Sequence, residues 1–316
     1  MNNFFDNQRI LTLIWKRKIH FIIVGIIAIA LSAVFSGPTF IQPKFKSTAR
    51  VYPTNIWVMS DESETEQMLE VINSNDIKMK MFDAFNLANV YNIDRNDPYY
   101  LTYMFYNYNK NVKTSKTEYE TVEINVMDYN PQRASNMCDS IIHFYDQKMG
   151  EMHKAKNLEM VLITQKHLDR KHKEYDSLKV LLNKVREEYG IFDFSGQSPE
   201  ITRGYMSALA TGRGSTADGQ KIEKLYDSFA ENGSAIQWLE DQNLTVIDAI
   251  DSIAGLHDKY LIEYEKNITY SHVVEHPIVA DKKSYPVRWL IVAFSTFSAV
   301  FLALVVFLVL DYRKED

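Results

Sequence analysis

The chain places its only two long apolar stretches close to its two ends. Neither residues 19–35 nor residues 289–310 contain a charged side chain. A helix rises about 1.5 Å per residue, and the hydrocarbon core of a bilayer is about 30 Å thick. The second stretch therefore predicts a full transmembrane helix, and the first predicts one that spans with help from Phe40, Ile41 or local thinning of the bilayer. We expect a membrane protein that is anchored at both ends.

Basic residues flank both stretches on their terminal sides. Arg9, Lys16, Arg17 and Lys18 precede the first stretch, and Arg313 and Lys314 follow the second. Lys282, Lys283 and Arg288 lie on the other side of the second stretch and weaken the asymmetry there. Positive residues near a span stay on the cytoplasmic side, whereas a long segment translocates largely regardless of its charge. We therefore expect both termini in the cytoplasm and residues 36–288 outside it.

A cleavable signal peptide is the alternative interpretation of the first stretch, because Ser36 and Gly37 could follow its apolar region. That region would be long, and Phe35 is a poor neighbour for a cleavage site.

The composition narrows the class of protein and of partner. The net charge of −6 argues against a nucleic-acid partner. Cys138 is the only cysteine, so no disulfide can form within the chain. A domain without disulfides is compatible with a bacterial periplasm.

Residues 36–149 show the mixed signals of an α+β domain. Alternating residues indicate strands, and apolar residues with a spacing of three and four indicate helices. In chain order we expect a strand at 46–51, a helix that begins at Ser60 or Asp61 and breaks near 73–76, a helix at 99–108, a strand at 117–127 and a helix from Pro131.

Residues 150–265 predict a long helical hairpin. Apolar residues recur every seventh position from Val161 to Tyr189, and residues 195–219 have the glycine-rich composition of a loop. A second series then alternates spacings of three and four, and its length predicts a helix of roughly 60 Å. We call this series the seam: Ile222, Leu225, Phe229, Asn232, Ile236, Leu239, Asn243, Val246, Ile250, Ile253, His257, Tyr260 and Tyr264.

The apolar members of the seam are the candidate packing and oligomer contacts: Ile222, Leu225, Phe229, Ile236, Leu239, Val246, Ile250 and Ile253. Its polar members Asn232, Asn243 and His257 either fix the register, as buried polar residues do in coiled coils, or face solvent.

The expected fold class is α+β and membrane-anchored, with two terminal transmembrane helices, a mixed base near the membrane and a long periplasmic helical hairpin. The boundaries that we expect are a flank (1–18), a span (19–35), the first part of the base (36–149), the helical arm with its tip near 195–219 (150–265), a return strand and link (266–288), a span (289–310) and a tail (311–316).

The sequence lacks the common catalytic motifs, including G-x-S-x-G, H-E-x-x-H and the phosphate-binding P-loop. The glycine-rich segment 211–215 has no lysine in register, and His272 and His276 lie on an expected strand, where residues four apart are ~13 Å from each other. We expect no enzyme activity, no cofactor and no metal.

A cluster of tyrosines could offer stacking platforms to sugar rings: Tyr99, Tyr100, Tyr103, Tyr106 and Tyr108. Tyr99, Tyr100 and Tyr103 are the candidate glycan contacts. The alternative, which we favour, is that these rings pack between a helix and the sheet with their hydroxyls reaching water.

The order of these features resembles the chain-length determinant (Wzz-type) polysaccharide co-polymerases over nearly the whole chain. The resemblance is carried by the following segments: LTLIWKRKIHFIIVGIIAIAL, Ser47–Tyr52, MLEVINSNDIKMKMFDAFNL, VEINVMDYNPQRASNMCDSIIHFYDQKM and VVEHPIVADKKSYP. The proline-rich approach to the second span is reduced here to Pro277 and Pro286, the membrane-junction prolines.

The resemblance implies a non-catalytic regulator of polysaccharide chain length in the bacterial inner membrane. Such proteins form homo-oligomeric rings and act beside a membrane polymerase on a lipid-linked glycan that becomes O-antigen, capsule or exopolysaccharide. Forms with a fused tyrosine kinase carry a large C-terminal domain, and here only six residues follow the second span. The resemblance therefore leaves a separate cytoplasmic tyrosine kinase as the partner to consider.

Two other classes share the two-span layout. A periplasmic sensor would need a partner for its output, because the short tail after the second span offers no domain to which a signal could be passed. An adaptor for polysaccharide export would have a similar hairpin but usually one span or none at the C-terminus. A membrane-bound enzyme is the weakest alternative.

Overall fold

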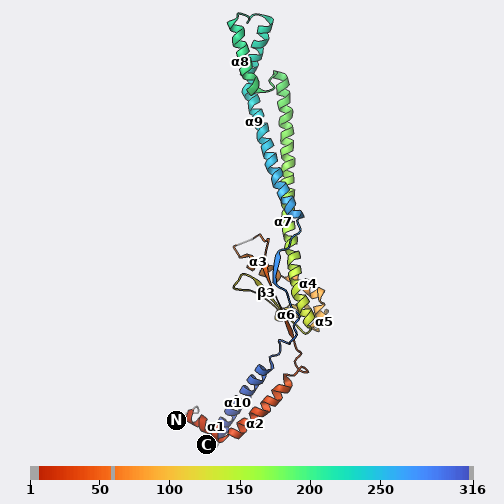
Figure 1. Ribbon diagram of the computed structural model, residues 1–316, viewed down its shortest axis with the longest axis vertical. Helices are drawn as coiled ribbons and strands as arrows, with labels where there is room; N and C mark the ends of the chain where they lie inside the picture. Colours follow the sequence, from red (N-terminus) through yellow and green to blue (C-terminus); the bar gives the residue numbers. More distant parts are fainter. Residues whose placement is uncertain (1–6, 58–60, 313–316) are drawn as a thin grey trace. The chain divides into compact units, whose positions relative to one another are not determined.

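The computed structural model describes residues 7–57 and 61–312 (Figure 1). Arg313, Lys314 and the expected helix cap Ser60 lie outside the described residues. The chain divides into two compact units. The base unit comprises Met1–Met149 and Thr269–Asp316, and the arm unit comprises Gly150–Ile268.

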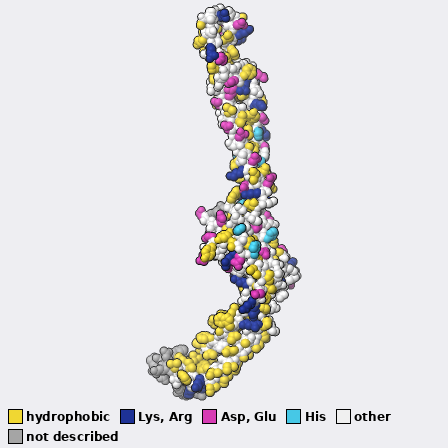
Figure 2. Space-filling model, viewed as in Figure 1, with side chains coloured by type: hydrophobic (Ala, Val, Ile, Leu, Met, Phe, Trp, Pro, Cys, Tyr) yellow, Lys and Arg dark blue, Asp and Glu magenta, His cyan; other side chains and the backbone are white. Residues whose placement is uncertain are grey.

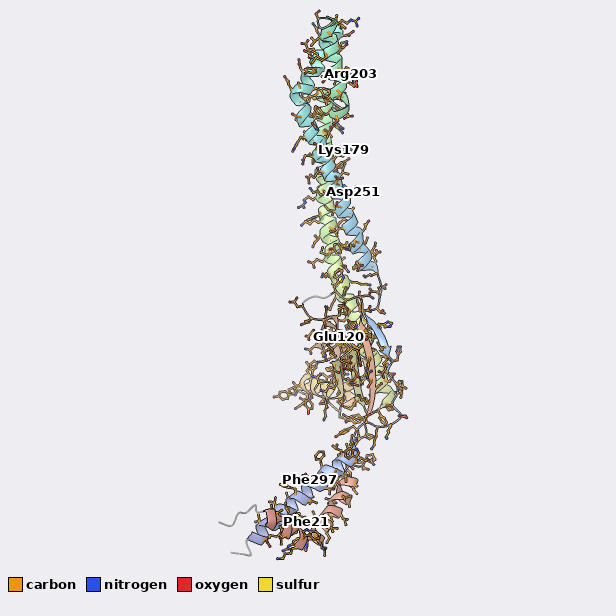
Figure 3. The ribbon with its side chains drawn as sticks, turned by 60° about the vertical axis from the view of Figure 1, so that its left-hand side comes forward. Phe21, Glu120, Lys179, Arg203, Asp251 and Phe297 are labelled. Atoms are coloured by element: carbon orange, nitrogen blue, oxygen red, sulfur yellow. The ribbon has the colours of Figure 1, made fainter. Side chains whose placement is uncertain are left out.

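Two helices of the base unit are long and apolar enough to cross a membrane, namely α2 (Lys18–Phe35) and α10 (Arg288–Tyr312). They lie side by side in both ribbon views (Figures 1 and 3), and the rings of Phe21 and Phe307 meet edge to face at 5.4 Å between centroids. Both apolar stretches therefore form helices of the length that the predicted spans require. A short helix that we did not predict, α1 (Asn7–Lys16), precedes them.

The sheet of the base unit is antiparallel with the strand order β2-β3-β1-β4. The strands are β1 (Phe45–Pro53), β2 (Val112–Lys116), β3 (Val122–Asp128) and β4 (Ser271–Glu275). The predicted strand at 117–127 was placed too early: Glu120 has a φ of 57° in the turn of the β2–β3 hairpin. This turn separates β3 from β2, a strand that we did not predict.

Five helical segments accompany the sheet: α3 (Glu64–Ile72), α4 (Asn75–Ala84), α5 (Leu87–Val90), α6 (Tyr100–Asn111) and the first part of α7 (Pro131–Tyr189). Ser63 caps α3, rather than Ser60 or Asp61, because it forms a capping box with Glu66. The thiol of Cys138 on α7 lies 3.6 Å from the carbonyl oxygen of Ser47 and 3.9 Å from that of Ile124, so α7 packs directly on β1 and β3.

The arm unit contains the rest of α7 together with α8 (Phe194–Ala210) and α9 (Ala217–Glu265). The prediction of a loop at 195–219 is wrong, because most of this segment forms the helix α8. Asp193 caps this helix by accepting a hydrogen bond from the N–H of Gly196, and Phe194 and Ile201 pack against the arm's apolar cluster. Tertiary packing thus overrides the weak helix propensity of the glycines. The real turns are short, and Gly190 and Gly212 have positive φ values there.

Candidate interaction site

The arm holds one apolar cluster that joins α7, α8 and α9. Its buried residues are Leu182, Ile191, Phe229, Ile236 and Leu239. The last part of the apolar series on α7, at Leu182 and Tyr189, therefore meets the seam of α9, as the sequence predicted. Leu225 and Phe194 pack against the edge of this cluster.

Every seam residue is at least half-buried within the single chain. Ile236 is fully buried, Val246 is 3% exposed, and Ile222, Ile250 and Ile253 are half-buried. The alternating spacing therefore marks the face of α9 that packs inside the arm. A role of the same residues between copies of the chain stays a prediction.

Close packing and polar contacts fix α8 and α9 near the cluster. The rings of Phe194 and Phe229 stack with 6.0 Å between centroids. A side chain at Gly233 would overlap the ring of Phe194, since its Cβ would lie 2.8 Å from Cδ2 and closer still to Cε2. Across the seam, Arg186 Nη2 donates to Glu240 Oε1 at 2.7 Å. These contacts define one register for the hairpin.

The first half of the arm has a polar interior that sequence reasoning missed. Asn157 is fully buried, Thr164 is 4% exposed and His153 is 5% exposed, all on α7. Burial, together with the charges of Lys266 and Lys156, lowers the pKa of His153. Neither atom of the Asn157 amide group has a hydrogen-bond partner among the described residues. The sequence did contain a signal for this polar interior. His153, Asn157 and Thr164 recur at helical spacing on the face of α7 that also holds Leu182 further along the helix.

The structure separates the tyrosine cluster into core and surface residues. Tyr108 is buried, and this burial raises the pKa of its hydroxyl. Tyr99 and Tyr103 are 64% and 45% exposed, and their rings meet edge to face at 6.3 Å. Tyr100, which lies between them in the sequence, is half-buried. The core interpretation is therefore wrong for Tyr99 and Tyr103, and contact of these rings with glycan stays a prediction.

The membrane-junction prolines lie in hydrogen-bonded links between the spans and the sheet. The carbonyl oxygen of Pro277 accepts from Ser135 Oγ at 3.2 Å. Pro286 is buried and follows Tyr285 through a cis peptide bond. The N–H of Lys44 donates to the carbonyl oxygen of Tyr285 at 3.0 Å. The two links are thus paired with each other where the chain leaves α2 and enters α10.

The other candidate groups do not gather into a site. His272 lies on β4 and His276 lies just beyond it. Over residues 7–57 and 61–312, no three His, Cys, Asp or Glu side chains are placed to hold a metal ion together. Segment 211–215 is part of the turn before α9, where Thr216 accepts a hydrogen bond from the N–H of Gly219.

Comparison with known proteins supports the resemblance noted from the sequence. Residues 3–85 match the family described as "Wzz: Chain length determinant protein". This match confirms the resemblance over the first span, β1, α3 and α4. No curated protein matches the chain.

Three solved structures are similar to the chain at low identity. A full-length bacterial polysaccharide co-polymerase has 14% identity and a TM-score of 0.47, with 96% of this chain and 97% of that chain covered. A point mutant of the lipopolysaccharide O-antigen chain-length regulator WzzBSF of Shigella flexneri has 14% identity and a TM-score of 0.31, with 76% and 100% covered. A fragment of the co-polymerase WzzB from Salmonella Typhimurium has 11% identity and a TM-score of 0.22, with 77% and 100% covered.

Proposed function

We propose that this chain regulates the length of a surface polysaccharide without catalysing its synthesis. The observation that carries the proposal is the match of residues 3–85 to the chain-length determinant family. Two spans near the termini and a helical arm between them are consistent with an anchored scaffold. The substrate class would be a lipid-linked glycan that becomes O-antigen, capsule or exopolysaccharide.

The proposed scaffold is a homo-oligomeric ring beside the membrane polymerase. Each copy would contribute two spans to the ring, and the packed seam of α9 would keep the arm straight enough to present a regular outer face. A separate cytoplasmic tyrosine kinase is the proposed regulator. These partners come from the family resemblance.

The decisive experiment is deletion of the gene followed by gel profiling of the surface polysaccharide. Loss of the chain should change the modal glycan length, and an unchanged profile would overturn the proposal. Complementation with Ile236→Asp should fail to restore the profile, because this side chain is fully buried in the arm. The matched control is Gln237→Asp, which places the same charge on the adjacent exposed residue of α9.

Cross-linking tests the ring separately. Chains cross-linked in native membranes should form a ladder that ends at a closed oligomer, whereas a strictly monomeric result would exclude the ring.

Topology is tested with protease sites. We propose that both termini are cytoplasmic and that the arm is periplasmic in the inner membrane. A protease site inserted at the turn 211–216 should be cut from outside spheroplasts, while one placed after Tyr312 should be cut only after lysis. The opposite pattern would reverse the proposed topology.

A further inference from the structure

An apolar groove opens between the two spans at the end where they join the base. Its volume is about 580 Å³. Its walls come from α2, from the segment after it and from α10, and they include Ala28, Leu31, Phe35, Ile41, Ile291 and Ala299. Small residues on both helices leave this space where larger ones would have filled it.

The polar side chains of the α2 wall are occupied by their own helix. The hydroxyl of Ser32 donates to the carbonyl oxygen of Ile29 at 3.2 Å, and that of Ser36 donates to the carbonyl oxygen of Ala33 at the same distance. The wall therefore presents mainly hydrocarbon. A groove of this kind in the hydrocarbon layer fits an apolar chain.

Three basic residues lie in the segment 282–288 that leads into α10, and we call them the basic collar: Lys282, Lys283 and Arg288. Asp281 is the one acidic residue beside them. Arg288 is the first residue of α10 and precedes the groove residue Ile291 by about one turn. Figure 2 shows Lys and Arg side chains gathered where the apolar spans meet the base. Among the described residues, none of the three collar side chains has an ion-pair partner within 4.0 Å.

The charge of the collar decides between the two kinds of apolar occupant. The apolar stretches of a second copy, residues 19–35 and 289–310, carry no negative charge that could neutralise the collar. An anionic phospholipid would instead place an acyl chain in the groove and a phosphate at the collar. Basic residues next to a membrane attract such lipids.

We propose that this groove binds one acyl chain of an anionic phospholipid, whose phosphate is held by the basic collar. The proposed lipid is of the phosphatidylglycerol type and lies on the side of the membrane that faces the base. The inference does not depend on the proposed role in chain-length regulation. Each can therefore fail without the other.

The test uses the purified full-length chain in membranes that contain phosphatidylglycerol or phosphatidylcholine, each spin-labelled on an acyl chain. Electron paramagnetic resonance separates lipid held by the protein from lipid in the bulk bilayer. We expect an association constant for phosphatidylglycerol about tenfold above that for phosphatidylcholine, since three cations lie at the collar. Equal association of the two lipids would overturn the proposal.

The collar is tested by the triple variant K282Q/K283Q/R288Q. Its preference for phosphatidylglycerol should fall to the level of phosphatidylcholine. The matched control is K179Q/K221Q/K224Q, which removes three charges from exposed side chains of the arm and should keep the preference. A collar variant that keeps the preference would contradict the assignment.

The groove is tested by filling it. Ala28→Phe should reduce the held fraction of both lipids, and Ala299→Phe should do the same from the other helix if the first variant folds poorly. Ile26→Phe is the control, because Ile26 is 62% exposed. If the filling variants changed the cross-linked oligomer and left the held lipid unchanged, the groove would hold a second copy and the proposal would be wrong.

Discussion

Asp146 on α7 binds the beginning of β4, because its Oδ2 accepts a hydrogen bond from Ser271 Oγ at 2.9 Å. Its Oδ1 accepts a second bond from the N–H of Tyr270, also at 2.9 Å. The whole arm unit, Gly150–Ile268, is inserted between these partners. One carboxylate thus joins the point where the chain leaves the base to the point where it returns.

Asp146→Ala should destabilise the base by about 1–3 kcal/mol, because two buried donors would lose their acceptor. The measurement is urea unfolding of the full-length chain in detergent, followed by helical circular dichroism. Asp251→Ala, a change at an exposed residue of α9 (Figure 3), is the control and should leave the midpoint unchanged. Equal effects of the two variants would show that the Asp146 contacts contribute nothing.

Two glycines of α9 should respond to alanine in opposite directions. At Gly233 the added Cβ meets the ring of Phe194, which is itself stacked on Phe229, so we expect a loss of about 1–3 kcal/mol from overpacking. At Gly255 no atom lies within 4 Å of the added Cβ, and the better helix propensity of alanine should stabilise the helix by ~1 kcal/mol. The same unfolding measurement compares both variants. A gain at Gly233 would mean that the ring moves freely.

Two ion pairs of the arm should differ in strength according to their burial. The side chains of Arg186 and Glu240 are 30% and 19% exposed, whereas those of Arg203 and Glu200 on α8 are 73% and 66% exposed (Figure 3). Double-mutant cycles to alanine should give about 1 kcal/mol of coupling for the first pair and under about 0.5 kcal/mol for the second. High salt should screen the exposed pair more strongly. Equal couplings would argue that Arg186 and Glu240 do not fix the register.

The spans and the seam could be predicted because each repeats one simple physical requirement over many residues. A bilayer demands some twenty apolar residues in a row, and a packed helix demands an apolar residue at every third or fourth position. From Ile222 to Tyr264 this spacing is kept, with apolar residues at ten of the thirteen positions, and each position is at least half-buried. Strand β1 and the start of α7 at Pro131 were likewise predicted from local signals.

The errors arose where long-range contacts decide the structure. Helix α8 contains two glycines and Pro199, and it forms because Phe194 and Ile201 pack against residues that are distant in sequence. Strand β2 is polar along most of its length and exists through its pairing with β3. The groove could not be predicted either, because Ala28 and Ala299 line the same space only when α2 and α10 pack.

The thiol of Cys138 should be almost unreactive in the native protein. It is fully buried on α7, and burial raises its pKa from 9.0 to about 12. At pH 8 only ~10⁻⁴ of a thiol with this pKa is ionised, and the thiolate is the reactive form. Because the pKa is raised on folding, the stability linked to this group is constant below about pH 9 and declines as the pH rises toward 12.

Labelling with a maleimide at pH 8 checks this prediction, first in detergent and then in urea. The native thiol should label at least about a hundredfold more slowly than the unfolded one, because labelling requires α7 to separate from β1 and β3. A Ser252→Cys variant supplies the reference, since this residue is exposed on α9 and its thiol should react at once. If Cys138 labelled as fast as that added cysteine, the contacts of its sulfur with the carbonyl oxygens of Ser47 and Ile124 could not persist in solution, and α7 would not be held on the sheet.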